Sequence, residues 1–93
     1  MSISVRIPTV MRNATNSVAI VQCAGKTISE VIADLTTQYP NLKDILFDSD
    51  SNLHKYVNIY LSDDDIRYIG GLDAEVKDGD EITLLPAVAG GSN

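Results

Sequence analysis

The sequence predicts an α+β domain of two layers, in which one main helix packs on one face of a mixed β-sheet. Apolar side chains recur at helical spacing along residues 28–35, and segments on both sides of them have the patterns of strands. An amphipathic helix must bury its apolar stripe, and a single sheet is the surface that these strands provide. A chain of 93 residues is large enough for one core of this kind.

Two strands are expected before the helix. Residues 3–7 alternate apolar and polar side chains, which is the period of a half-buried strand, and Pro8 weakens the end of this strand. Residues 11–17 are polar and are expected to form a loop, and residues 18–22 predict a second strand. Strands this close in the chain most simply form a hairpin.

The helix has a start signal and a stop signal. The Thr27 hydroxyl is expected to accept from the backbone N–H of Glu30, while the Glu30 carboxylate reaches back to the N–H of Thr27. The residue before Pro40 avoids helical dihedrals, so the helix should end there, and residues 42–47 should add one more helical turn. The apolar stripe between these signals consists of Ile28, Val31, Ile32 and Leu35.

The second half of the chain opens with its clearest strand pattern. Residues 57–61 place apolar side chains at alternate positions. The three aspartates of residues 63–65 are expected to turn the chain, and residues 66–69 to form a short edge strand. Gly70 and Gly71 predict a loop.

The last strand completes the fold prediction. Asp78 and Gly79 are typical of a tight turn, residues 81–85 follow as a strand, and pairing should end near Pro86, which has no N–H to donate. A hairpin, a helix and then returning strands is the order of the β-grasp (ubiquitin-like) fold. In that fold the first and last strands pair in parallel at the sheet centre. The C-terminus would then leave from the middle of one end of the sheet.

Residues 1–86 are therefore predicted to form the domain, and residues 87–93 a flexible tail. Gly90 and Gly91 have no Cβ and can pass through a narrow slot. From Pro86 to Gly91 an extended chain reaches about 20 Å, at roughly 3.3–3.6 Å per residue. That length would bring a terminal carboxyl into a partner's active site. Composition alone favours a frayed terminus over such a functional tail.

Composition and charge exclude several classes of protein. The net charge of −6 and the scattered basic residues argue against a nucleic-acid surface, which needs clustered Lys and Arg. The acidity suits a basic protein partner or simple solubility. No apolar run has the length of a membrane span, and no signal-peptide pattern is present. The single cysteine, Cys23, excludes an internal disulfide and fits a reducing cytoplasm, where we expect the protein to be located.

Two motif-like segments do not have the spacing that their chemistry needs. Residues 25–27, Gly-Lys-Thr, resemble the end of a phosphate-binding loop, but Ile20 stands where that motif needs a glycine. Residues 48–52 resemble the start of a calcium loop. Leu53 and Ile59 stand where its glycine and bidentate glutamate are required, so this segment is interpreted as an acidic loop.

No set of residues predicts catalysis. The aspartates of residues 63–65 are typical of a solvated turn, and His54 has no nucleophile at a recognisable spacing. Cys23 is a candidate sulfur relay, but a lone thiol at a strand end is more often a small packed side chain. Without a nucleophile–base or acid–base pair, the chain is not expected to be an enzyme by itself.

The chain resembles the MoaD/ThiS family of ubiquitin-like sulfur carrier proteins, and within it the carriers of cysteine biosynthesis. The similar stretches are residues 4–9, 53–60, 63–67 and 85–91, which together cover most of the chain. The last stretch is the most specific, because its Gly-Gly pair follows the final strand and lies close to the terminus.

The resemblance implies a carrier that binds no cofactor itself. An E1-like adenylyltransferase and sulfurtransferase would bind the domain and use ATP to adenylate the carboxylate of Gly91. A sulfur donor would then displace AMP, and the resulting thiocarboxylate would give its sulfur to an acceptor enzyme such as a cysteine synthase. The tail that would enter the partner's active site consists of Ala87, Val88, Ala89 and Gly90.

The sequence departs from the family pattern after the diglycine. Ser92 and Asn93 follow Gly91, which therefore has a peptide bond where the chemistry needs a free carboxyl. Either a peptidase, a JAMM-type zinc enzyme in related systems, cleaves between Gly91 and Ser92, or the two residues do not belong to the natural protein. Some relatives carry a short extension of this kind, which favours a precursor.

Other functions stay open from the sequence. One is a protein modifier that forms isopeptide bonds between Gly91 and lysines, and another is a sulfur carrier for molybdopterin or for the thiazole of thiamine. A third is a binding module that uses the acidic face and does not need the tail.

Overall fold

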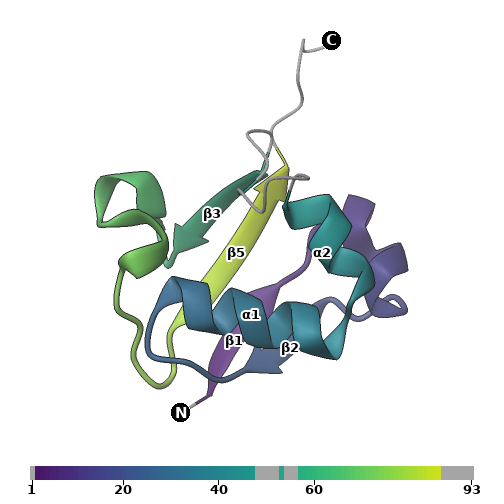
Figure 1. Cartoon of the computed structure of the whole chain (residues 1–93), viewed down its shortest axis with the longest axis horizontal. Helices are drawn as coiled ribbons and strands as arrows, with labels where there is room; N and C mark the ends of the chain where they lie inside the picture. Colours follow the sequence, from purple (N-terminus) through teal and green to yellow (C-terminus); the bar gives the residue numbers. More distant parts are fainter. Residues whose placement is uncertain (1, 48–52, 54–56, 87–93) are drawn as a thin grey trace, which may run out of the picture.

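A mixed sheet with the order β2-β1-β5-β3-β4 forms one layer of the computed structural model, which describes residues 2–47, 53 and 57–86. Central β1 and β5 are parallel, while β2 on β1, and β3 on β5, are antiparallel. This is the predicted β-grasp arrangement, and the fold prediction is confirmed (Figure 1). The strands are β1 (Ile3–Arg6), β2 (Ile20–Cys23), β3 (Val57–Leu61), β4 (Asp64–Asp65) and β5 (Glu81–Pro86).

Two helices cover one face of this sheet, α1 (Ile28–Gln38) and α2 (Asn41–Leu46) (Figure 1). The predicted apolar stripe of α1 is buried, and so are Leu42 and Leu46 of α2. On the strands, buried side chains alternate with more exposed ones, as in β1, where Ile3 and Val5 point into the core. None of the helices that the structure describes has the length and apolar character needed to span a bilayer.

The start of α1 confirms one half of the predicted capping box and corrects the other. The N–H of Glu30 donates to the Thr27 hydroxyl at 3.2 Å, as expected. The Glu30 carboxylate, however, accepts from the N–H of Lys26 at 2.9 Å rather than from Thr27. Thr27 instead lies in an isolated antiparallel bridge with Glu75, which ties the start of the helix to the segment before β5.

The hairpin connection is more regular than predicted. Residues 11–17, expected as a loop, fall largely in the 3-10 helix η1 (Thr9–Thr15). Its Met11 is buried, and the left-handed conformation of Asn16 ends it. The second strand begins at Ile20 rather than at position 18, because the chain is still leaving this helix.

The predicted edge strand at residues 66–69 is wrong. The turn is made by Ser62 and Asp63, and the edge strand is Asp64–Asp65, which pairs with the end of β3. Residues Ile66–Tyr68 form the 3-10 helix η2, because the Asp65 side chain accepts from the N–H of Arg67 and caps it. Only Ile66 of this segment is buried. A strand with one face on the core would bury every second side chain, so this pattern fits a single helical turn better.

The loop after η2 holds the predicted turns. Gly70 has a φ of +118°, and η3 (Gly71–Asp73) follows it. The predicted turn at Asp78 and Gly79 is confirmed: the N–H of Asp80 donates to the backbone carbonyl of Lys77 at 2.9 Å, and Gly79 has a φ of +89°. The final strand then runs to Pro86, where pairing was expected to end. The predicted tail, residues 87–93, lies outside the described residues.

The presence of glycine at position 25 is explained by close packing rather than by phosphate binding. A Cβ at this position would lie 2.8 Å from the Cβ of Glu30 and 2.8 Å from the backbone N of Val31. The absence of a side chain therefore lets the chain between β2 and α1 pass against the first turn of the helix.

Cys23 is a core residue at the end of β2. Its side chain is buried, and burial, with a smaller contribution from the charge of Asp34, raises the pKa of the thiol to about 12. The amide of Gln38 lies 3.7 Å from its sulfur. A sulfur relay needs a thiolate near neutral pH, so the structure supports the packed side chain over the relay.

Replacement of Gly25 by alanine is expected to lower the free energy of unfolding by about 1–3 kcal/mol through overpacking. The entropy that alanine removes from the unfolded chain offsets only about 0.4–1 kcal/mol of this loss. Urea denaturation measures the effect, with Ser29→Ala on the exposed face of α1 as the control, expected to change it by less than about 0.5 kcal/mol. Equal stability of Gly25→Ala and the parent chain would show that the contact is not tight.

The Cys23 thiol is expected to resist a disulfide reagent at pH 8 in the native protein and to react at once in denaturant. Because its folded pKa of about 12 lies above the ordinary value of 9.0, the unfolded chain loses this proton first as the pH rises. The stability due to this group is thus complete below about pH 9 and is lost between that pH and about 12. Fast modification of the folded protein at pH 8 would contradict the burial of the thiol.

Candidate functional site

The candidate site is the end of β5, from which the predicted tail leaves. Along its first half β5 is paired on both sides, with Ser4–Arg6 of β1 opposite Glu81–Thr83. β3 continues to pair with it up to Pro86, which stands opposite Val57. Pairing in the centre of the sheet therefore holds β5 as far as Pro86, the residue before the predicted tail (Figure 1).

The pairing on the β1 side stops earlier. β1 ends at Arg6, and the N–H of Ile7 donates to the carbonyl of Ala19 at 2.7 Å as the chain turns into η1. In the described part of the chain, no strand pairs with the last residues of β5 on this side. The departure of β1 leaves a gap in the sheet surface beside Leu84 and Leu85.

A hollow of about 360 Å³ occupies this gap. Arg6, Thr83 and Leu85 line it and alternate along their strands with the buried side chains of Val5, Ile82 and Leu84, so it opens on the sheet face opposite the helices. Its lining includes Arg6, Thr9, Arg12, Ile20, Thr83 and Leu85.

Both arginines of the hollow are held by hydrogen bonds. The Nε of Arg6 lies 3.2 Å from a carboxylate oxygen of Glu81, and both side chains are exposed. The Nε of Arg12 donates to the carbonyl of Ile7 at 3.2 Å, which ties η1 to the end of β1. The basic residues are scattered along the sequence. These two are brought together only by the hairpin, and no spacing in the sequence indicated it.

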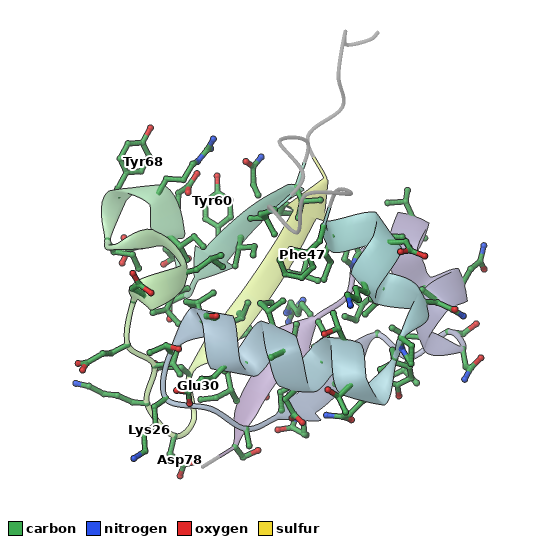
Figure 2. All side chains as sticks on the ribbon, in the orientation of Figure 1. Lys26, Glu30, Phe47, Tyr60, Tyr68 and Asp78 are labelled. Carbon is green, nitrogen blue, oxygen red and sulfur yellow. The ribbon has the colours of Figure 1, made fainter. Side chains whose placement is uncertain are left out.

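The opposite end of the domain carries many of the carboxylates. The turn between β3 and β4 and the segment before β5 hold exposed Asp63, Asp64, Asp73, Glu75 and Asp78. Leu61 pairs with Ile82 at this end, whereas Val57 pairs with Pro86 at the other. Figure 2 shows Asp78 and Lys26 at the end of the molecule away from the end of β5.

The aspartates of the turn do not form a metal site. Asp63 and Asp64 are exposed, as predicted for a solvated turn. Asp65 accepts from the Arg67 side chain at 2.7 Å, and this hydrogen bond is the main cause that lowers the pKa of the carboxyl. Within residues 2–47, 53 and 57–86, no three His, Cys, Asp or Glu side chains gather as metal ligands would.

The remaining candidates are either placed away from this site or not described. Lys26 is exposed in a loop, as predicted. Residues 48–52 and His54 lie outside the described residues. So do the predicted tail and cleavage residues, Ala87, Val88, Ala89, Gly90, Gly91 and Ser92.

Comparison with known proteins identifies the family of this chain. Residues 5–91 match the ThiS family. The chain is 44% identical over 93 residues to sulfur carrier protein CysO of Mycobacterium tuberculosis, an alignment that covers 98% of this chain and all of that protein.

Two solved structures are similar to the whole domain. A chain in the crystal structure of the BexX/CysO complex of Amycolatopsis orientalis has a TM-score of 0.86 and 44% identity, over 96% of this chain and 99% of that one. Small archaeal modifier protein 1 of Methanosarcina acetivorans has a TM-score of 0.83 and 32% identity, over 97% of this chain and 96% of that one. The family match covers nearly all of the sequence, and the chain belongs to the ThiS family.

Proposed function

We propose that the chain carries sulfur for cysteine biosynthesis, as a thiocarboxylate at the carboxyl group of Gly91. The observation that carries this proposal is the 44% identity with sulfur carrier protein CysO along almost the whole chain. The chain is a small carrier of the ThiS family rather than a catalyst. Within the described residues, the buried thiol of Cys23 is the one cysteine and has a raised pKa, which agrees with this assignment.

The domain supplies a rigid mount and the tail supplies reach. β5 lies between two strands and is in register with β3 up to Pro86, so the sheet determines the position of the residue before the proposed tail. Binding of the domain by a partner then lends its free energy to a reaction at a distant atom. The small residues Gly90 and Gly91 suit a narrow active site, where a Cβ would collide.

The proposed chemistry has two steps, both performed by a partner enzyme. A carboxylate oxygen of Gly91 attacks the α-phosphorus of ATP and expels pyrophosphate, giving an acyl adenylate. A sulfur nucleophile then attacks the acyl carbon and AMP leaves. The first step is needed because the negative charge of a carboxylate repels nucleophiles, whereas an adenylate has a good leaving group.

The proposed partners follow from these steps. An E1-like enzyme with adenylyltransferase and sulfurtransferase activity loads the tail, and an acceptor enzyme such as a cysteine synthase receives the sulfur. The CysO of Amycolatopsis orientalis forms a complex with BexX, which supports partner enzymes for this chain as well.

A cleavage step before loading is part of the proposal. Ser92 and Asn93 follow Gly91, so the carboxyl of Gly91 is free only after they are removed. The match to the ThiS family ends at Gly91, which supports that residue as the mature end. A JAMM-type zinc peptidase is the proposed enzyme.

A second function is favoured by one similarity. The modifier protein of Methanosarcina acetivorans is 32% identical to this chain with the same fold, so the activated Gly91 could instead be attacked by a lysine amine of a target protein. Adducts of the chain on lysines, found by mass spectrometry of cell extracts, would favour the modifier. Thiocarboxylate without adducts would favour the carrier.

Loading tests the carrier function directly. A chain ending at Gly91 is incubated with ATP, sulfide and the E1-like enzyme of the same genome, and its intact mass is expected to rise by one sulfur minus one oxygen. Gly91→Ala in this chain is expected to lower kcat/KM by about 100-fold through misplacement of the carboxyl. Ser29→Ala, on α1, serves as the control. Loading of the full-length chain with Ser92 and Asn93 still attached would overturn the mechanism.

Trimming is expected to depend on a metal. In native extract the full-length chain should lose the mass of Ser92 and Asn93, and a zinc chelator should stop this loss, because the catalytic zinc lowers the pKa of the attacking water. Added zinc should restore cleavage. Loss of the two residues at the same rate in chelator would exclude a zinc peptidase.

A further inference from the structure

We propose that Asp34 and Gln38 of α1 form an autoinhibitory contact, which covers the outer edge of β2 and prevents this edge from pairing with β2 of a second copy of the chain. β2 is an edge strand of the described sheet, with β1 on one side of it only (Figure 1). The proposal concerns self-association of the domain and does not depend on the proposed function.

The register of the hairpin determines which backbone groups of β2 point outward. The N–H of Ile7 donates to the carbonyl of Ala19 at 2.7 Å, so these two residues form a hydrogen-bonded pair. Hydrogen-bonded and non-hydrogen-bonded pairs alternate along an antiparallel ladder. By this alternation the backbone groups of Val21 point to β1, whereas the N–H and C=O groups of Ile20 and Gln22 point away from it.

Two side chains of α1 cover one end of this outer edge. The amide nitrogen of Gln38 donates to the carbonyl of Gln22 at 2.9 Å, and the carboxylate of Asp34 accepts from the N–H of Ala24 at 2.9 Å. The Gln38 amide also donates to Asp34 at 3.2 Å, one helical turn earlier, so each side chain holds the other in place. A strand from another molecule would have to displace both of them to pair with this end of β2.

The other end of the edge is covered by the hairpin connection. The Thr15 hydroxyl donates to the carbonyl of Val18 at 2.9 Å, and the Thr15 carbonyl accepts from the N–H of Val18 at 3.0 Å. Between the two covered ends, the N–H and C=O of Ile20 and the N–H of Gln22 have no hydrogen-bond partner among the described residues. This gap is shorter than a usual strand, so the α1 side chains decide whether the edge is long enough to pair.

A second copy of the chain is the occupant that the uncovered edge would fit. An edge is complementary to itself about a two-fold axis, because antiparallel strands exchange N–H and C=O groups. The side chain of Ile20 is 45% exposed, so pairing would also bury apolar surface. The same axis brings Asp34 of both copies to one seam, and each copy has a net charge of −6, so charge repulsion adds to the covering of the edge.

The test compares the full chain with the double variant Asp34→Ala/Gln38→Ala by analytical ultracentrifugation. Concentrations up to about 1 mM are used, because one pair of strands makes a small and therefore weak interface. The parent chain is expected to keep the mass of one chain, whereas the mass of the double variant should approach twice that value. Added salt should strengthen this dimer, since it screens the repulsion between two acidic copies. The control, Ser29→Ala/Thr37→Ala at exposed positions of α1, should stay a monomer.

Amide hydrogen exchange locates the contact within the dimer. In the parent chain the amides of Ile20 and Gln22 are expected to exchange faster than that of Val21, because only Val21 donates to β1. In the dimer of the double variant the same two amides should become protected. Addition of Ile20→Lys to the double variant should restore the monomer, since lysines on two paired edges repel each other.

Three results would overturn the proposal. One is a folded double variant that keeps the mass of one chain, and another is a parent chain that dimerises as readily as the variant. The third is a dimer in which the amides of Ile20 and Gln22 gain no protection. Circular dichroism and thermal melting show whether each variant is folded. If the double variant is not, Gln38→Ala alone, at an exposed position, should give a smaller rise in mass, and a constant mass would count against the proposal in the same way.

Discussion

The parallel pairing of β1 with β5 is the interaction on which the rest of the structure depends. A parallel pair cannot be closed by a tight turn, so the chain between the two strands has to cross over the sheet, and α1 lies in that crossover. The crossover also covers one face of the sheet and completes the core. Because β5 is then central, its last residues are held by pairing with β3 as far as Pro86.

The helix also protects the sheet edge that the hairpin leaves exposed. Asp34 accepts from the N–H of Ala24 at 2.9 Å, and Gln38 donates to the carbonyl of Gln22 at 2.9 Å. These side chains occupy groups at the outer edge of β2 that would otherwise be available to a strand from another molecule. The other edge strand, β4, has only two residues. Neither edge of the sheet therefore offers a long row of free backbone groups to a strand from another molecule.

Sequence patterns predicted the parts of this fold that local physics determines. The helix over residues 28–38 follows from its apolar period and its cap, and the turn at Gly79 from the conformation that glycine favours. The 3-10 helices and the Lys26–Glu30 hydrogen bond could not be predicted, because both depend on how the chain packs. The hollow was missed for the same reason: Arg12 and Leu85 lie far apart in the sequence and meet only where β1 ends.

The proposed division between domain and tail would explain why the described domain has no reactive group of its own. Its one cysteine is buried and its Asp65 carboxylate is paired with Arg67, so neither is available to a substrate at neutral pH. A carrier that reacted by itself would lose its sulfur before meeting the correct acceptor. Reactivity that exists only in a partner's active site avoids this loss, and the selection of that partner then falls to the domain surface.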